Sequence, residues 1–420
     1  MKKVYLKGPF LTQSGYGHHA RTVYRALRSR PDLFDVYVQP IIWGQTSWIW
    51  EDTAERKEFD SLLEKTIQYV NFGGQFDMSV QITIPNEWEK LAPINIGVTA
   101  GIESDTISLK WIEKSYVVDK IITISKHSKD GLVNTVLDVV NNTNGQKQKV
   151  SCKTPVEYVT YPVRKFEPSD IELNLTTDFN FLAVAQISPR KNLEQLLHCF
   201  VEEFKDNENV GLVVKANLAK NSLVDRVNTL ESFQRLVSKY EDRKCKIYLL
   251  HGFLSDKDMA ALYTHPKIKA FVSTTHGEGF GLPIFEAAYY GLPIAATNWS
   301  GHLDFLCKPA KTKGKGKEKL KPLFKRISYT LEQVPKELAW EGVLEEYSKW
   351  ANPETGSVKM ALEEIYRDYP RFKKQAKVLE EWVCEEFNAK KQYEQIVDLI
   401  KPEDDSDWLD QIEDLVKEYE

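Results

Sequence analysis

Short apolar segments alternate with amphipathic segments along this chain, and they do so in two successive series. Helical periodicity at 22–28 and 129–136 separates or follows apolar runs in the first series, and the second series begins near residue 181. Because parallel strands need long crossovers, each series predicts a parallel sheet with helices packed on it. The predicted strands are Val4–Lys7, Val36–Ile41, Met78–Ile82, Asn95–Thr99 and Ile121–Ser125, then Phe181–Ala185, Leu212–Lys215, Ile247–Leu250, Ala270–Ser273 and Ile294–Thr297.

A chain of 420 residues is too long for one typical hydrophobic core, so two domains are expected. The segment 158–170 contains two prolines and is the predicted linker. We expect an N-terminal domain over 1–165, a second domain over 166–390 and a C-terminal helical segment over 391–420. Two parallel sheets joined in this way place a ligand cleft at the carboxyl ends of their strands.

Composition narrows the class of protein. A net charge of −5 argues against a globally basic nucleic-acid binder, and no run approaches the roughly 18 apolar residues of a membrane span. The start of the chain lacks the apolar core of a signal peptide, so a cytoplasmic location is expected. Five scattered cysteines without paired spacing predict reduced thiols and no metal site.

The segment 268–304 carries the most specific chemistry. An apolar strand ending at Ser273 is followed by Gly277, Gly279 and Gly281, and a helix with proline in its first turn is predicted over Pro283–Tyr290. Glycines there let the backbone approach a ligand, and the free N–H groups of a helix start bind phosphate. Two carboxylates frame the turn, Glu278 and Glu286, and each can accept sugar hydroxyls. The glycines alone are equally compatible with an ordinary strand-to-helix turn.

The combined string resembles the donor-site signature of the family 4 retaining glycosyltransferases, two glutamates separated by seven residues around Gly-Phe-Gly-Leu-Pro. The whole chain, including Leu11–Gly17, is similar to members carried by tailed phages. The resemblance extends over most of the chain to about residue 400. It implies an α/β protein of the GT-B fold, in which two Rossmann-like domains with parallel sheets face across a cleft. It also implies a nucleotide-sugar substrate, of which UDP-sugars are the commoner kind, with no metal and no separate cofactor.

The resemblance assigns roles to individual residues. Glu278 would contact the donor sugar as a catalytic residue, and Lys191 with Arg190 would neutralise the leaving diphosphate. Gln186 stands where the family usually has arginine, so Arg190 beside the lysine is the candidate substitute. Glu286 would hold the ribose. The other implied donor-binding residues are Gly15, Tyr16, Gly17, Gln186, His251, Gly252, Phe253, Gly279, Phe280, Gly281 and Leu282.

The loop Gly15–Ala20 by itself also matches a dinucleotide fingerprint, which favours a dehydrogenase. That interpretation lacks the acidic residue expected after the next strand, which ends Val38-Gln39-Pro40. A non-catalytic nucleotide-sugar binding protein and an epimerase also remain open. A phosphorylase is less favoured, because no pyridoxal-phosphate lysine motif is recognisable.

The acceptor is less constrained by the sequence. Glu103, Asp105 and His127 follow predicted strands of the first domain and are acceptor-side candidates. Eight lysines between 308 and 326, among them Lys311, Lys313 and Lys315, form either a solvated insertion or a surface for a polyanion. Double-stranded DNA with a modified base is therefore one candidate acceptor, beside a glycan, lipid or protein. An amphipathic acidic helix predicted over 404–419 packs on the body or mediates self-association.

Overall fold

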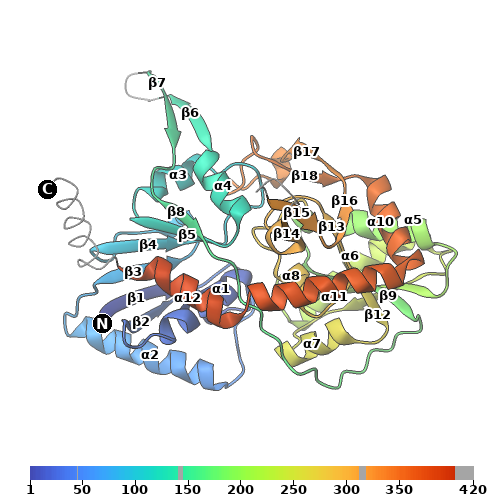
Figure 1. Cartoon of the computed structure of the whole chain (residues 1–420), viewed down its shortest axis with the longest axis horizontal. Coiled ribbons are helices and arrows are strands. Elements are labelled where there is room, and N and C mark those ends of the chain that lie inside the picture. Colours follow the sequence, from blue (N-terminus) through green and yellow to red (C-terminus); the bar gives the residue numbers. More distant parts are fainter. Residues whose placement is uncertain (45, 141–144, 312–317, 403–420) are drawn as a thin grey trace.

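The computed structural model describes residues 1–44, 46–140, 145–311 and 318–402, and it contains two domains side by side (Figure 1). Each domain is built on a six-stranded sheet in which every pairing is parallel. The predicted α/β class with two parallel sheets is therefore confirmed. The amphipathic segment predicted over 404–419 lies outside the described residues.

The sheet of the first domain has the order β2-β1-β3-β4-β5-β8. Helices cover both faces of this sheet, so that all five residues of β3, including Ser79 and Gln81, are buried. Ser14, Thr53, Ser108 and Ser125 cap the four helices, each accepting a backbone N–H from the first turn. The elements are β1 (Lys2–Gly8), α1 (Gly15–Arg28), β2 (Phe34–Pro40), α2 (Ala54–Asn71), β3 (Met78–Ile82), β4 (Ile94–Val98), α3 (Leu109–Ser115), β5 (Lys120–Thr123), α4 (Lys126–Asn134) and β8 (Val156–Tyr158).

The sheet of the second domain has the order β11-β10-β9-β12-β13-β16. One face packs on α5 and α10 and the other on α7, α8 and α11, through two separate apolar clusters. The elements are β9 (Phe179–Gln186), α5 (Leu193–Phe204), β10 (Val210–Asn217), α6 (Leu223–Val237), β11 (Lys246–Leu250), α7 (Asp256–Thr264), β12 (Ile268–Ser273), α8 (Leu282–Tyr289), β13 (Ile294–Thr297), α9 (Leu303–Leu306), β16 (Lys325–Ile327), α10 (Thr355–Arg367) and α11 (Tyr369–Glu386).

Three two-stranded antiparallel pairs stand outside the main sheets, among the described residues. The pair β6 (Val136–Val140) with β7 (Lys147–Ser151) projects from the first domain (Figure 1). The other pairs are β14 (Cys307–Lys311) with β15 (Glu318–Pro322), and β17 (Tyr329–Gln333) with β18 (Lys349–Pro353).

Each of the ten predicted strands overlaps an observed strand, and Met78–Ile82 and Ile294–Thr297 match to the residue. The helix predicted over 129–136 is misplaced at both ends. Ser125 caps a helix that begins at Lys126, and the chain turns extended at Thr135 before β6 begins. The short edge strands β8 and β16 have too few residues to show a periodicity, and the pattern missed them.

The chain crosses twice between the domains. It first passes through 159–178, which contains no helix or strand. It then returns along α11 to α12 (Ala389–Ile400), which runs beside the first domain (Figure 1). Ile396, Val397 and Ile400 are buried there in the same apolar cluster as Val4 and Leu27. No helix in the described part of the chain is both long and apolar enough to cross a bilayer.

The domains meet backbone against backbone at the carboxyl ends of their sheets. A Cβ atom at Gly279 would overlap the carbonyl oxygen of Ala100, and one at Gly277 would overlap that of Glu103. Gly301 packs equally tightly, since its added Cβ would overlap the carbonyl oxygen of Gly279. Only glycine permits this approach, so Gly277 and Gly279 set the distance between the two domains, and Gly301 sets the distance between two loops of the second domain.

We predict that Gly301→Ala destabilises the protein by about 1–3 kcal/mol, because the added methyl group has no space among backbone atoms that cannot move aside. The measurement is chemical denaturation of the whole chain. Gly356→Ala is the control, since a Cβ there meets nothing within 4 Å and alanine favours the helix α10. Equal stability of both variants would contradict the tight contact.

Candidate functional site

A cluster of charged side chains lies where the carboxyl ends of the two sheets meet. After β9 the chain makes a short turn over Pro189–Lys191, and Asn192 adopts a left-handed conformation with φ of 52° before α5 begins. The amide of His276 donates to the carbonyl oxygen of Arg190 at 2.9 Å. This turn therefore places Arg190 and Lys191 directly beside the glycine-rich loop that follows β12.

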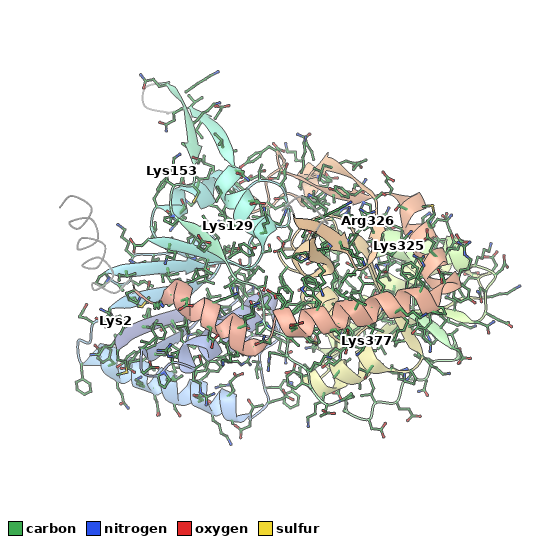
Figure 2. The ribbon with its side chains drawn as sticks, in the orientation of Figure 1. Lys2, Lys129, Lys153, Lys325, Arg326 and Lys377 are labelled. Carbon is green, nitrogen blue, oxygen red and sulfur yellow. The ribbon has the colours of Figure 1, made fainter. Side chains whose placement is uncertain are left out.

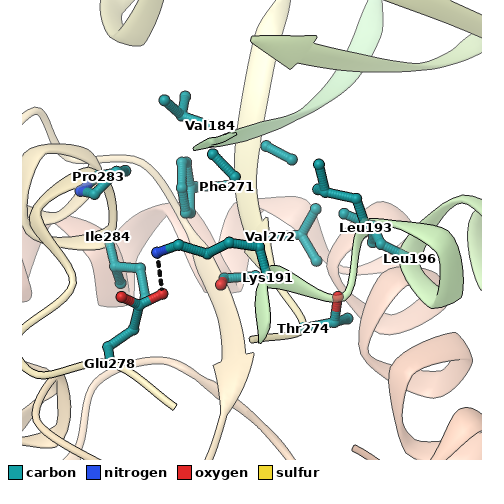
Figure 3. A pocket seen from close by; sticks show the side chains of 13 residues that line it. Val184, Lys191, Leu193, Leu196, Phe271, Val272, Thr274, Glu278, Pro283 and Ile284 are labelled. Carbon is teal, nitrogen blue, oxygen red and sulfur yellow. Dashed lines mark hydrogen bonds and ion pairs between the residues drawn. The ribbon is translucent and has the colours of Figure 1, made fainter. Parts of the chain in front are cut away.

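Glu278 is the centre of the cluster. Its side chain is only 8% exposed and accepts from Lys191 Nζ at 2.5 Å (Figure 3). It also accepts from Arg190 Nη1 at 3.2 Å. Burial by itself would raise the pKa of this carboxyl, but Lys191 and Arg190 outweigh it and hold the pKa well below its usual range. Glu278 is thus a buried carboxylate that stays ionised at neutral pH.

Arg190 joins the cluster to the first domain. Its guanidinium also donates to the carbonyl oxygen of Gly277 at 2.6 Å and lies 3.3 Å from the carboxylate of Glu103. Burial lowers the pKa of Lys191, against the opposing pull of Glu278. The two cations and the two carboxylates therefore neutralise one another across the domain boundary.

The cavity beside this cluster is narrow. Val184, Phe271 and Ile284 line it together with Lys191 and Glu278 (Figure 3). Its free space holds about one water molecule. A ligand larger than a water molecule does not fit this space as it stands.

A hydrogen-bonded turn after β13 holds the backbone of Glu278. The amide of Glu278 donates to Ser300 Oγ at 2.9 Å, and Ser300 has a left-handed φ of 84° that is unusual for serine. His302 is fully buried, and its Nε2 lies 2.6 Å from the carbonyl oxygen of Thr297. Because a carbonyl can only accept, Nε2 carries the proton and Nδ1, 3.4 Å from Ser300 Oγ, is an acceptor. Ser300 and His302 thereby position the loop that carries Glu278.

Glu286 lies in the helix α8 and does not contact the cationic pair in the described structure. Its Oε2 accepts from the hydroxyl of Tyr263 at 2.7 Å. Burial raises the pKa of Glu286 to about 7, although the Tyr263 bond opposes the rise. This carboxyl therefore titrates close to neutral pH, whereas Glu278 does not.

The glycine loop of the first domain opens α1. Ser14 Oγ accepts the amide of Gly17 at 2.9 Å, and a Cβ at Gly17 would overlap the carbonyl oxygen of Thr12. Gly15 is exposed, with open space around it. The hydroxyl of Tyr16 lies 2.8 Å from Thr99 Oγ1, so this residue links α1 to the loop after β4.

The predicted base-binding loop follows β11. His251 Nε2 lies 2.7 Å from Asp225 Oδ1, and both side chains are nearly buried. Gly252 has a φ of 107°, which favours glycine, and Phe253 packs edge-on against Trp50 of the first domain. Gln186 turns to the neighbouring loop, where its Nε2 donates to the carbonyl oxygen of Leu218 at 2.9 Å.

The remaining sequence-predicted residues have separate surroundings. Phe280 is buried against Tyr161, Phe285 and Phe305, so only its backbone is available to a ligand, and Gly281 and Leu282 begin α8. Lys313 and Lys315 lie outside the described residues, as does the side chain of Lys311.

The three acceptor-side candidates have different surroundings in the structure. Glu103 joins the charged cluster through Arg190. Asp105 Oδ1 instead accepts the amide of Lys349 at 2.7 Å, which makes it a contact between the domains. His127 packs edge-on against Trp299, and burial lowers its pKa to about 4. Its Nε2 is buried without a hydrogen-bond partner among the described residues.

Sequence reasoning did not single out several neighbours of the site. Ser300, His302, Tyr263 and Asp225 act through contacts with residues 2 to 26 positions away. Only the spacing of Ser300 and His302 after the predicted strand 294–297 pointed toward the cleft.

Within the described residues, no group of three or more histidine, cysteine, aspartate or glutamate side chains is placed to hold a metal ion.

Comparison with solved structures settles the fold. Sucrose-phosphate synthase from Thermosynechococcus elongatus superposes with a TM-score of 0.60, covering 95% of this chain and 98% of that one at 13% identity. Anabaena HepE, solved in complex with UDP-glucose, superposes with a TM-score of 0.58. The match covers 95% of this chain and 99% of that one, at 12% identity. The chain has the GT-B fold.

Sequence comparison concerns mainly the second domain. Residues 166–314 match the family described as glycosyl transferases group 1. The serotype-specific mannosyltransferase WbdA of Escherichia coli is 29% identical over 143 residues, which are 33% of this chain and 16% of that protein. Sucrose-phosphate synthase of Spinacia oleracea is 32% identical over 133 residues, 30% of this chain and 12% of that protein. The chain thus spans a small part of these relatives. The segment 166–314 that matches the family contains Arg190, Lys191, Glu278 and Glu286.

The raised pKa of Glu286 predicts a pH dependence of stability. The pKa rises on folding from its ordinary 4.5 to about 7, so the stabilising contribution of the protonated carboxyl is complete below 4.5 and is lost as pH rises through 7. Glu286→Gln cannot ionise, so its stability relative to the wild type should increase between about pH 5 and pH 8. Denaturation midpoints across this range provide the measurement. Parallel pH curves for the two proteins would contradict the prediction.

Proposed function

We propose that this protein transfers a sugar from a UDP-linked donor to an acceptor hydroxyl, with retention of configuration and without a metal ion. The observation that carries the proposal is the buried cluster of Lys191, Arg190 and Glu278 at the carboxyl edge of the second sheet. It lies within the segment that matches group 1 glycosyl transferases. The GT-B fold agrees with such a reaction but does not by itself define one.

The cluster has the charges that the reaction needs. A diphosphate brings negative charge that competes with Glu278 for Lys191 and Arg190, and the cations then stabilise the charge developing on the leaving phosphate. Glu278, released from them, is free to accept hydroxyl hydrogen bonds from the donor sugar. Glu286, which lies on α8 behind the glycine loop, would accept the ribose hydroxyls. Gly15–Gly17 and His251–Phe253 would contact the diphosphate and the base.

The proposed reaction needs no side chain of the protein as a base. The bond from the anomeric carbon to the phosphate oxygen breaks, and a bond from that carbon to the acceptor oxygen forms on the same face. The acceptor proton passes to the departing phosphate oxygen. His127, with its lowered pKa of about 4, is neutral at pH 7 and is not required as a proton acceptor.

The experiment begins with the donor alone. UDP-glucose, GDP-mannose and UDP are tested for protection of the full chain against thermal unfolding, where a ligand at 100 times its Kd adds about 2.7 kcal/mol. Glu286→Ala should abolish protection, and Lys191→Ala should lower transfer by about 10²–10³-fold. Lys239→Ala, a change at an exposed lysine outside the cluster, is the control. Absence of protection by every nucleotide-sugar would overturn the proposal.

Product analysis separates the competing functions. Retention predicts the same anomeric configuration in donor and product by NMR. Donor protection without transfer to any acceptor would support a binding protein, and conversion of a UDP-sugar without an acceptor would indicate an epimerase.

A modified base of phage DNA is a second candidate acceptor, favoured by the basic hairpin β14–β15. Lys308 pairs directly with Lys321 across the hairpin, and like charges in that position repel each other. Neither of them, nor Lys319, makes an ion pair with another described residue. Figure 2 shows Lys325 and Arg326, which follow the hairpin, on the same domain. A polyanion would relieve this repulsion.

If DNA is the acceptor, the triple change Lys308→Ala, Lys319→Ala and Lys321→Ala should lower the slope of log affinity against log salt by about 2–3. Binding of a hydroxylated DNA duplex is measured at several salt concentrations. The control replaces Lys2, Lys153 and Lys239, which are exposed elsewhere. An unchanged slope in the hairpin variant would exclude this role.

A further inference from the structure

Exposed tryptophans gather on the loop between β2 and α2. Trp48 is 46% exposed and Trp50 is 73% exposed, and both line a hollow at the boundary between the domains. Large apolar side chains grouped at the surface mark binding sites more often than chance exposure. The hollow encloses about 980 Å³, counting the space open to solvent, which suits a small-molecule unit.

The wall formed by the first domain is held in place by backbone hydrogen bonds. Trp48 forms an antiparallel bridge with Thr12. On either side of it, the amide of Gln13 donates to the carbonyl oxygen of Ser47 and the amide of Ile49 donates to that of Leu11, both at 2.8 Å. The tryptophans therefore project from a fixed strand-like segment.

The opposite wall belongs to the second domain and is bonded to the first. Asn221 Nδ2 donates to Gln13 Oε1 at 2.9 Å, and the amide of Asn221 donates to Ser47 Oγ at 3.1 Å. Trp50 also packs edge-on against Phe253 of the second domain. The hollow thus depends on the two domains being in contact.

Its lining combines aromatic faces with neutral polar groups. Hydroxyls and amides come from Thr46, Ser47, Ser222, Gln13 and Asn221, and Lys220 is the one charged residue among the described lining. Hydroxyls and amides both donate and accept hydrogen bonds, as a polyol requires, and indole rings provide large, flat apolar contact. A nucleic acid would instead need several cations for its phosphates.

We propose that this hollow binds a neutral pyranose unit of the acceptor, with its apolar face against Trp48 or Trp50 and its hydroxyls toward Gln13 and Asn221. The inference rests on the proposed glycosyl transfer and assigns its acceptor class as a carbohydrate. Gln13 immediately precedes Ser14, the cap of α1. An acceptor held there would therefore lie beside the glycine loop proposed to face the donor diphosphate.

Direct binding tests the assignment. Methyl glycosides of glucose, mannose and galactose, and their linear disaccharides, are titrated into the ¹⁵N-labelled full chain while the indole N–H signals are recorded. The signals of Trp48 and Trp50, assigned from Trp48→Phe and Trp50→Phe, should shift with at least one sugar. The indole signal of Trp340, which is 60% exposed and lies in another turn, should not shift. Trp48→Ala, Trp50→Ala or Asn221→Ala should weaken binding of that sugar by about tenfold, and Trp340→Ala should leave it unchanged.

The outcomes are separable from those of the proposed function. No shift at either tryptophan with about 50 mM of any of these sugars would overturn the assignment, because even a millimolar Kd saturates there. A shift at Trp48 and Trp50 with a hydroxylated DNA oligonucleotide in place of the sugars would overturn it in favour of a nucleic-acid acceptor. UDP-sugar protection should persist in all the tryptophan variants. If the wild type binds glycosides but no nucleotide-sugar, the transfer function fails while the sugar site stands.

Discussion

A buried carboxylate must be paired with positive charge, and in this protein the pairing of Glu278 organises the site around it. Lys191 and Arg190 satisfy it only because the chain after β9 turns sharply, with Asn192 in a left-handed conformation. The guanidinium of Arg190 also donates to the carbonyl oxygen of Gly277 and pairs with Glu103 of the first domain. The same charged cluster therefore connects the two domains. The two cations and the two carboxylates of the cluster balance one another.

The glycine contacts complement this electrostatic constraint with a steric one. Gly277, Gly279 and Gly301 let backbone press on backbone, which brings the loops after β4, β12 and β13 together without intervening side chains. Ser300 and His302 then hold the amide of Glu278 from behind. Since peptide groups cannot rotate away as side chains do, the position of Glu278 is determined by the fold.

The two glutamates of the signature differ in their environments, although the sequence presents them as a symmetrical pair. Glu278 faces two cations and remains ionised, whereas burial raises the pKa of Glu286 to about 7, beside a tyrosine hydroxyl. Gln186 is turned to the loop at Leu218, and Arg190 lies in the cluster. The cationic pair is thus formed by adjacent residues on one turn.

The sequence by itself determined the two parallel sheets, because apolar runs separated by amphipathic segments have few other ways to bury their surface. The strand-to-helix turns also indicated the glycines, and the resemblance to a known donor-site signature indicated Lys191 and Glu278. Only the tertiary structure decided how the loops meet. The bonds of Asn221 to Gln13 and Ser47, the bond of Arg190 to Glu103, and the return of α12 to the first domain join residues that lie at least 87 positions apart in the sequence. Such contacts follow from the relative placement of whole domains, which no local pattern of residues encodes.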